Sequence, residues 1–435
     1  MISIDIPSSV EEIEDEAFFG CISLKDVNIA DSVYCIGYGA FENCTALTSI
    51  EIPSSVEELG DRAFAGCKNL QSIIIPDSVD YIEYDVFKGC ARLTDISVDP
   101  DNPHYCSNGK MLLTKDQTEL VSYPSASGEI KDIPSSVVEL NGSFSGCKTL
   151  TSVSIPSSVR IIGFEAFEDC ISLKSIKIPS SVYRIDYRAF SGCTELSSIS
   201  IPSSVTDLGD YTFDGCTNLK SVSIPSSVTT IGTAAFQNCI SLKSIKIPSS
   251  VTEIGKGAFA GCVGLTSIKI PSSVNDIGSF AFYGCKNLTD ITVDSQKSYY
   301  RSNGKMLLNW LGTILFSYPS ASGDVNDIPS GVLVIEYAAF YGCTDITSVR
   351  IPDSVKEIRD VSFYGCTGMS SIVIPSSIEK IGYFAFEACT SLTEIVYEGS
   401  KLQFEQLMDE VKSKDSFMGV PAKVIHCSDG DIDLL

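Results

Sequence analysis

The sequence has little histidine, tryptophan or positive charge. Its 435 residues include two histidines, one tryptophan and 31 Lys or Arg against 55 Asp or Glu, which gives a net charge of -24. An electrostatic field of this sign repels phosphate backbones, so no nucleic-acid partner is expected. Apolar runs of about 18 residues are also missing, and no membrane span is therefore expected.

Motifs that carry catalysis or hold cofactors are missing as well. The sequence has no Gly-rich phosphate loop, Gly-x-Ser-x-Gly turn, His-Glu-x-x-His or Cys-x-x-Cys. Its two histidines, His104 and His426, are far apart in the chain. The acidic loops at 99–103 and 428–433 lack the ligand spacing of a dedicated calcium site and are interpreted as solvated turns. We expect no enzymatic activity, no catalytic residues, no cofactor and no metal.

What the sequence does have is a period of 23 residues. The unit Val-x-x-Ile-Gly-x-x-Ala-Phe-x-x-Cys-x-x-Leu-x-x-Ile-x-Ile-Pro-x-Ser recurs along nearly the whole chain. Its phenylalanines are Phe18, Phe41, Phe64, Phe87, Phe144, Phe167, Phe190, Phe213, Phe236, Phe259, Phe282, Phe340, Phe363 and Phe386. Copies at a fixed period of this length are the coils of a solenoid rather than independent domains.

Each unit contains a strand, a corner and a turn. Ile176 and Ile178 alternate with polar residues, which is typical of a strand with one buried face. Pro179 ends that strand, and the serines after it are expected to bond to local backbone. The stretch that ends at Phe190 is too short for a stable helix and reads as one helical or 3₁₀ turn. Stacked coils then form a parallel sheet with the Phe, Leu, Ile and Cys columns inside.

The pattern "IPSSV..IG..AF.GC..LTSI" resembles the BspA-like leucine-rich repeats, which are found mostly in bacterial surface proteins and in some protists. The resemblance covers essentially the whole chain. It implies a curved right-handed solenoid that serves adhesion or protein recognition, at the cell surface or secreted, without catalytic residues. The start "MISIDIPSSV" does not look like a signal peptide, so a cytoplasmic location stays open.

The repeats are interrupted twice. We expect coils at 1–98, 133–293 and 328–397, β-hairpin inserts at 99–132 and 294–327, and a C-terminal helix–strand cap at 398–435. Both inserts contain "SNGKMLL" and "SYPSASG". They are either contact points that project from the solenoid or neutral products of a duplication. Trp310, the single tryptophan, lies in the second insert and is a candidate partner-binding residue.

The two ends of the solenoid differ. Helical spacing and a capping box between Ser400 and Gln403 predict an amphipathic helix over the last coil. Its apolar residues are Phe404, Leu407, Met408 and Val411. At the other end the chain begins on a strand, whose edge is open to pairing with preceding sequence of a longer protein or with a partner. We favour the longer protein.

Fourteen of the seventeen cysteines occupy one position of the repeat, and only Cys35, Cys106 and Cys427 do not. Stacked at the coil spacing, their parallel Cβ vectors make a disulfide dihedral hard to reach. We therefore expect free thiols that act as small buried apolar residues.

Lysines gather on the outward positions of the predicted strands. The candidate partner-binding residues there are Lys174, Lys177, Lys220, Lys243, Lys246 and Lys269, with Arg350 in the same column further along the chain. One interpretation is duplication of a three-coil block, because "CISLKSIKIPSSV" occurs twice. The other is a docking strip for an acidic partner, either a protein (of the extracellular matrix or a host surface) or a sulfated glycan. An intracellular protein–protein interaction scaffold is the alternative function, and a spacer is the third.

Overall fold

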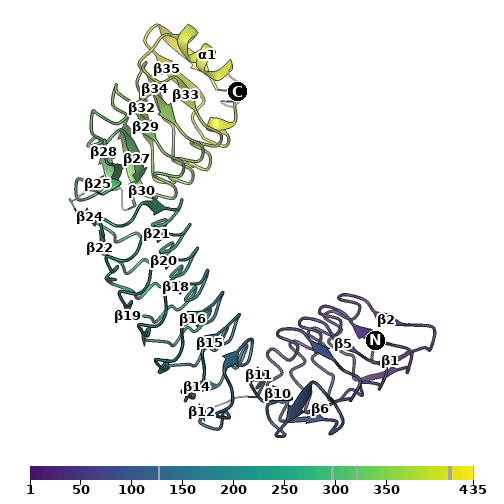
Figure 1. The fold of residues 1–435 in the computed structure, drawn as a ribbon. Coiled ribbons are helices and arrows are strands. Elements are labelled where there is room, and N and C mark those ends of the chain that lie inside the picture. Colours follow the sequence, from purple (N-terminus) through teal and green to yellow (C-terminus); the bar gives the residue numbers. More distant parts are fainter. Residues whose placement is uncertain (126–127, 295–297, 320–321, 410–413, 435) are drawn as a thin grey trace. The chain divides into compact units, whose positions relative to one another are not determined.

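The computed structural model is a leucine-rich-repeat solenoid, which confirms the predicted fold class (Figure 1). It describes residues 1–125, 128–294, 298–319, 322–409 and 414–434. The chain forms two compact units, residues 1–228 and 229–435, and each is considered by itself. Among the described residues there is no helix long and apolar enough to cross a membrane.

In the first unit, most coils contribute one strand of three or four residues and one strand of two. The longer strands are β1 (Ser3–Ile6), β3 (Asp26–Ile29), β6 (Ser72–Ile75), β8 (Asp95–Val98), β12 (Gly128–Ile130), β14 (Leu150–Val153), β17 (Ser198–Ser200) and β19 (Ser221–Ser223). The short strands are β2 (Glu12–Ile13), β4 (Cys35–Ile36), β5 (Glu58–Leu59), β7 (Tyr81–Ile82), β13 (Glu139–Leu140), β15 (Ile161–Ile162), β16 (Arg184–Ile185) and β18 (Asp207–Leu208). Neighbouring coils pair in parallel, as the shared side-chain pattern predicts.

The second unit repeats this arrangement. Its longer strands are β22 (Ser267–Ile270), β24 (Asp290–Val293), β28 (Ser322–Val325), β30 (Asp345–Arg350), β32 (Ser371–Ile374) and β34 (Glu394–Tyr397). Its short strands are β20 (Thr230–Ile231), β21 (Glu253–Ile254), β23 (Asp276–Ile277), β29 (Val334–Ile335), β31 (Glu357–Ile358) and β33 (Lys380–Ile381). We call the surface formed by the outward residues of the longer strands, together with the isolated bridge residues Lys177 and Lys246 at the equivalent positions of their coils, the strand face.

The turn before each cysteine is not a 3₁₀ helix. Two of its residues, such as Glu165 (φ 52°) and Asp169 (φ 55°) around Phe167, adopt left-handed backbone conformations. The amides of these three residues donate to carbonyls of the next coil, at 2.8–3.0 Å. Left-handed residues interrupt a helix, and here they direct the amides along the solenoid axis instead.

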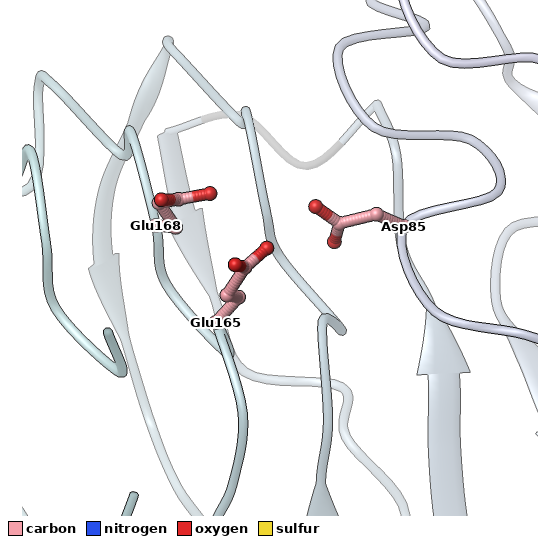
Figure 2. A group of neighbouring side chains, drawn as sticks. All are labelled: Asp85, Glu165 and Glu168. Carbon is pink, nitrogen blue, oxygen red and sulfur yellow. The ribbon is translucent and has the colours of Figure 1, made fainter. Parts of the chain in front are cut away.

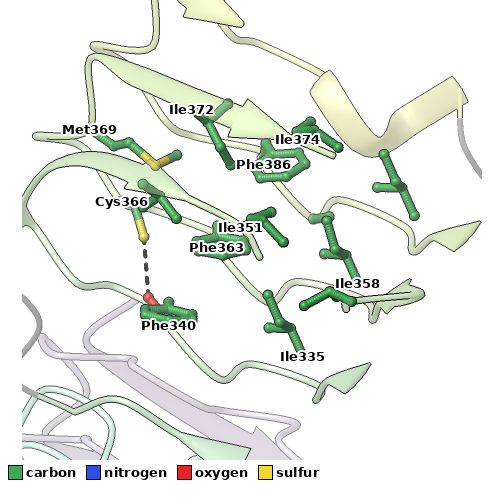
Figure 3. Packing of buried hydrophobic residues seen from close by; sticks show 14 of the residues in the cluster. Ile335, Phe340, Ile351, Ile358, Phe363, Cys366, Met369, Ile372, Ile374 and Phe386 are labelled. Carbon is green, nitrogen blue, oxygen red and sulfur yellow. Dashed lines mark hydrogen bonds between the residues drawn. The ribbon is translucent and has the colours of Figure 1, made fainter. Parts of the chain in front are cut away.

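Columns of identical residues form the core. Phe167 and Phe190 are fully buried, and their rings stack with centroids 5.3 Å apart. Most cysteines of the column donate from Sγ to the carbonyl of the phenylalanine one coil earlier, as Cys366 does to Phe340 at 3.2 Å (Figure 3). Cys147 and Cys343 donate instead to the carbonyls of Tyr123 and Tyr318, both at 3.2 Å. All seventeen cysteines lie within the described residues, and none of them forms a disulfide. The thiols are therefore weak hydrogen-bond donors as well as apolar filling.

The serines after the proline also join one coil to the next. Ser181 Oγ donates to Val159 O at 2.7 Å, and Ser55 Oγ donates to Val33 O at the same distance. The partner is thus the preceding coil and not local backbone. Since the serine is repeated, it satisfies a carbonyl at the same corner of successive coils.

Each insert is a three-stranded antiparallel hairpin unit whose last strand joins the short-strand sheet. The first hairpin comprises β9 (Tyr105–Ser107), β10 (Leu112–Thr114) and β11 (Glu119–Ser122), and the second comprises β25 (Tyr300–Ser302), β26 (Leu307–Asn309) and β27 (Ile314–Ser317). Tyr123 and Tyr318 follow these hairpins and pack on Phe144 and Phe340, in place of the missing phenylalanine.

The C-terminal cap is present. Helix α1 (Lys401–Asp409) starts with the predicted capping box, in which Ser400 N donates to Gln403 Oε1 at 2.8 Å. Phe404 and Leu407 are buried, Met408 is partly buried, and Val411 lies outside the described residues. The 3₁₀ helix η1 (Lys414–Phe417) places Phe417 on Phe386, with ring centroids 4.9 Å apart. Strands β35 (Val424–Cys427) and β36 (Gly430–Asp433) extend the sheet beyond β34.

Candidate functional site

In the first unit, the predicted lysines occupy the outward side of the coils. Lys177 is exposed and forms a parallel bridge with Ser154 on the neighbouring coil. Lys174 and Lys220 occupy the same column with Ser197 between them, since the amide of Ser197 donates to Lys174 O and that of Lys220 to Ser197 O. The two lysines are thus two coils apart, roughly 10 Å at the usual strand spacing.

In the second unit, Lys246 and Lys269 lie side by side on bridged coils. Lys269 Nζ is 2.7 Å from Asp294 Oδ1, and both side chains are largely exposed. Lys243 is exposed at the entrance of the same coil as Lys246. Neighbouring like charges repel, and the carboxylate of Asp294 relieves this repulsion on one side.

Arg350 lies on β30 and is already engaged. Its Nη2 is 2.6 Å from Glu398 Oε1, beside the cap. An exposed pair of this kind contributes little stability, but it neutralises the cation that the sequence offered to a partner. The sequence analysis predicted neither the pairing of Arg350 with Glu398 nor that of Lys269 with Asp294.

The second hairpin exposes a cluster of large side chains. Trp310 is 54% exposed, Leu311 72% and Tyr299 63%. Together with Ser298 and Asn309 they line a shallow hollow at the turn between β26 and β27. The sequence singled out Trp310 and missed its two neighbours. A comparison of the inserts position by position would have found them, because the first hairpin has Lys115, Asp116 and His104 at the equivalent positions.

Three carboxylates that the sequence did not predict to meet converge in the first unit: those of Asp85, Glu165 and Glu168 (Figure 2). They surround the ammonium of Lys88, which is 2.9 Å from Asp85 Oδ2, 3.6 Å from Glu165 Oε2 and paired with Glu168. Arg188 Nη1 adds a second cation 2.8 Å from Glu168 Oε1. The chain's own cations therefore occupy the place that a metal ion would take.

Burial sets the protonation state of this cluster. Burial and hydrogen bonding with Asp85 raise the pKa of Glu165 to about 8. Asp85 Oδ1 is buried and has no other hydrogen-bond partner among the described residues. The raised pKa favours a protonated Glu165 at neutral pH, which can donate its proton to Asp85. We therefore interpret the cluster as a buried ion-pair network that belongs to the fold and not as a binding site.

Where the coils on either side of the second insert meet, an aromatic contact replaces the charge cluster. Phe280 and Tyr283 occupy the positions equivalent to Asp85 and Lys88. Phe280 packs edge-to-face on Tyr341, with centroids 5.1 Å apart, and Tyr283 packs on the same ring at 5.0 Å. A cavity of about 300 Å³ lies beside them, lined also by Phe316, Tyr318 and Tyr337. Equivalent positions next to the two inserts thus carry charged side chains in the first unit and aromatic side chains in the second.

The histidines form no catalytic constellation in the described part of the chain. His426 Nδ1 is 2.9 Å from Asp431 Oδ1 on the exposed cap, and His104 lies on the first hairpin. Neither ring is bonded to a serine, threonine or cysteine side chain within the described ranges. Asn102, in the acidic loop near His104, is fully buried and donates to Pro76 O and Val79 O, so it anchors the hairpin.

Comparison with known proteins identifies the repeat. The family model "BspA type Leucine rich repeat region (6 copies)" matches residues 1–106, 139–262, 229–304 and 314–408. No curated protein matches the chain.

Several solved structures are similar. A leucine-rich repeat protein from Bacteroides ovatus is 29% identical, with 98% of this chain and 84% of that chain covered and a TM-score of 0.36. A leucine rich cell surface protein from Faecalibacterium prausnitzii is 26% identical, with 83% and 90% covered and a TM-score of 0.37. A leucine-rich repeat protein from Eubacterium ventriosum is 23% identical, with 91% and 78% covered and a TM-score of 0.34.

Proposed function

Because the chain belongs to the BspA-type leucine-rich repeat family, we propose that it is a non-enzymatic recognition protein that binds a macromolecular partner through the strand face of its coils. The observation that carries the proposal is the set of exposed lysines on that face, in a chain whose net charge is -24. Lys246 and Lys269 lie on bridged coils, and Lys177 has an equivalent position in the first unit.

The partner is an acidic macromolecule, because local positive charge is the chemical feature that distinguishes this face. Our first candidate is an acidic protein segment, and a sulfated glycan has the same charge chemistry. The resemblance to bacterial surface repeats favours display outside the cell, where the partner would be a matrix or host-surface protein. If the protein is located inside the cell, the same face would bind partner proteins of an intracellular interaction scaffold.

Charge reversal at one lysine in each unit tests the strand face. Lys177→Glu combined with Lys246→Glu is expected to weaken binding to heparin, or to immobilised matrix proteins, on the order of tenfold at moderate salt. The matched control is Lys68→Glu with Lys286→Glu, which makes the same charge change at exposed positions directly after the cysteine column.

Surface plasmon resonance measures the affinities, and circular dichroism checks that the thermal midpoint stays the same. Equal weakening by the strand-face variant and the control would show a nonspecific charge effect. Unchanged binding by the strand-face variant would reject the lysines as the site.

A further inference from the structure

We propose that the second hairpin carries a separate protein-binding site, formed by Tyr299, Arg301, Trp310 and Leu311. Its occupant is an extended protein segment with a large apolar side chain next to a carboxylate. We call these four residues the hairpin site. The proposal goes beyond the strand face and does not rest on the lysines there.

The exposed side chains of the hairpin site have no evident role in folding. Tyr299, Trp310 and Leu311 are each more than half exposed, although large apolar residues usually gain stability from burial. Tyr, Trp and Arg are also the residue types that dominate binding energies at protein interfaces. A cluster of them on one turn therefore indicates an interaction surface rather than a core.

The first hairpin shows that this backbone folds without an apolar cluster. At the position equivalent to Leu311, Asp116 holds the turn by accepting from Thr118 N at 3.0 Å and from Thr114 Oγ1 at 2.8 Å. In the second hairpin Asn309 stabilises the turn instead, because its Oδ1 accepts from Thr313 N at 2.8 Å and from Ile314 N at 3.0 Å. The side chain of Leu311 therefore does not stabilise the turn, and its apolar character requires another explanation.

Two hydrogen bonds position the hairpin site on the solenoid. Trp310 N donates to Tyr299 O at 2.9 Å, which fixes the two aromatic residues beside each other. Tyr300, between Tyr299 and Arg301, is buried and its hydroxyl accepts from Ile277 N at 3.1 Å, which ties the hairpin to the preceding coil. Binding to a preformed surface loses less conformational entropy than binding to a mobile loop.

The charge of Arg301 determines the partner's chemistry. Its guanidinium lies across Gly312, so close that an added Cβ on Gly312 would collide with it. This places the cation at the turn that also carries Leu311, and within the described ranges Arg301 has no acidic partner. A carboxylate on the bound segment would complete the pair while its apolar neighbour covers Trp310.

Two other occupants fit less well. A second copy of this chain also has a net charge of -24, and an anionic membrane has the same sign, so both are repelled. A protein segment needs only one local carboxylate and avoids most of this repulsion. We therefore assign the hairpin site to a heterologous protein segment.

The experiment uses a phage-displayed library of random 12-residue peptides, selected against the full chain. The expected consensus is a large apolar residue flanked by Asp or Glu. A fluorescein-labelled synthetic peptide of that sequence is then titrated, and anisotropy gives its Kd. Because Trp310 is the only tryptophan, a blue shift of the intrinsic emission on binding reports directly on the hairpin site.

Three variants make the result specific. Replacement by the first hairpin's residues (Tyr299→His, Trp310→Lys, Leu311→Asp) is expected to raise the Kd by about tenfold or more, as loss of hot-spot residues does. Arg301→Glu should remove the preference for acidic flanks. Ile74→Lys, which removes an apolar residue that is 63% exposed elsewhere, should leave the Kd unchanged.

Several outcomes would overturn the proposal: no enriched sequence, a consensus without a carboxylate, or a Kd that the replacement variant does not change. Concentration-dependent self-association, or binding to phosphatidylcholine vesicles, that disappears in the replacement variant would assign the site to a different occupant. Lys177→Glu with Lys246→Glu should leave peptide binding intact, so failure of the strand-face proposal and failure of this one are distinguishable.

Discussion

Lys88 is the residue whose removal tests the buried charge cluster most severely. Its side chain is 12% exposed, and those of Asp85 and Glu168 are 2% and 7% exposed. Lys88→Met keeps most of the aliphatic volume but leaves the carboxylates of Asp85, Glu165 and Glu168 without their shared ammonium. The variant therefore isolates the charge from the packing.

The expected loss is about 3 kcal/mol at neutral pH, the lower end of the range for breaking a buried ion pair. The lower end applies because Arg188 still pairs with Glu168, and because Glu165 can remain protonated. Asp85 is destabilised most, since its remaining partners among the described residues are Ser145 Oγ, at 3.2 Å, and the protonated Glu165. Lys68→Met, at an exposed lysine of the same unit, is the control and should change stability by less than about 0.5 kcal/mol.

Urea unfolding of both variants at pH 5.5 and pH 8.5 provides the assay. At the lower pH the orphaned carboxylates can take up protons, so the deficit of Lys88→Met should shrink. At the higher pH the deprotonated form of Glu165 grows, and the deficit should be largest. A loss below about 1 kcal/mol, or an equal loss at the two pH values, would refute the role given to Lys88.

The remaining predictions concern the wild-type charge cluster, the hairpin anchors and the thiols. The pKa of Glu165 is raised to about 8, so between its unfolded value near 4.3 and that pKa the folded protein holds a proton that the unfolded chain does not. This group therefore makes wild-type stability fall as pH rises through that window, and urea midpoints that rise instead would contradict it. Tyr105→Phe leaves the buried amide of Ile82 without its phenolic acceptor at 2.9 Å, and Tyr300→Phe leaves the partly buried amide of Ile277 without its acceptor at 3.1 Å. Each change should cost about 1–3 kcal/mol in chemical unfolding, and a neutral result would show that the phenol does not anchor the hairpin. Iodoacetamide should modify only the partly buried Cys21, Cys106 and Cys427 of the native protein, because the others are buried. Burial also raises the pKa of Cys44 to about 11 and that of Cys285 to about 12, and peptide mapping that finds these two labelled would contradict the buried column.

The sequence predicted the coil well because every coil obeys the same rule. The positions of Phe190, Cys193 and Leu196 are fully buried, as the shared 23-residue register requires. It predicted the turns less well. Glu165 and Asp169 adopt left-handed conformations that glycine would favour, because hydrogen bonds to the next coil hold them there. Periodicity indicates which residues face inward but not the backbone path between them.

Contacts outside the repeat could not be read from the period. Lys88 meets Glu165 and Glu168 only because the first insert replaces a coil between them. The pairing of Lys269 with Asp294 likewise depends on where the last strand before the second insert ends. The hairpin site could be predicted in part, since Trp310 is unique in the sequence, but Tyr299 and Leu311 are recognised as part of it only from their exposure in the structure.

Equivalent positions next to the two inserts have the same backbone arrangement but different side-chain contacts. Equivalent positions carry Asp85 and Lys88 in one junction, and Phe280 and Tyr283 in the other. The first pair is buried in an ionic cluster, and the second contributes to an aromatic contact. Since the surrounding coils are alike, these differences reside in side chains alone.

Site-specific photo-crosslinking determines whether the protein recognises partners through the strand face and the hairpin site. A benzoylphenylalanine residue is placed in turn at Lys246 on the strand face, at Trp310 on the hairpin site and at Asp207 on the short-strand side, and each variant is irradiated with intact source cells and with their extract. We expect discrete protein adducts from Lys246 and Trp310 and none from Asp207. Adducts that are equally abundant at all three positions, or that form only at Asp207, would contradict this expectation.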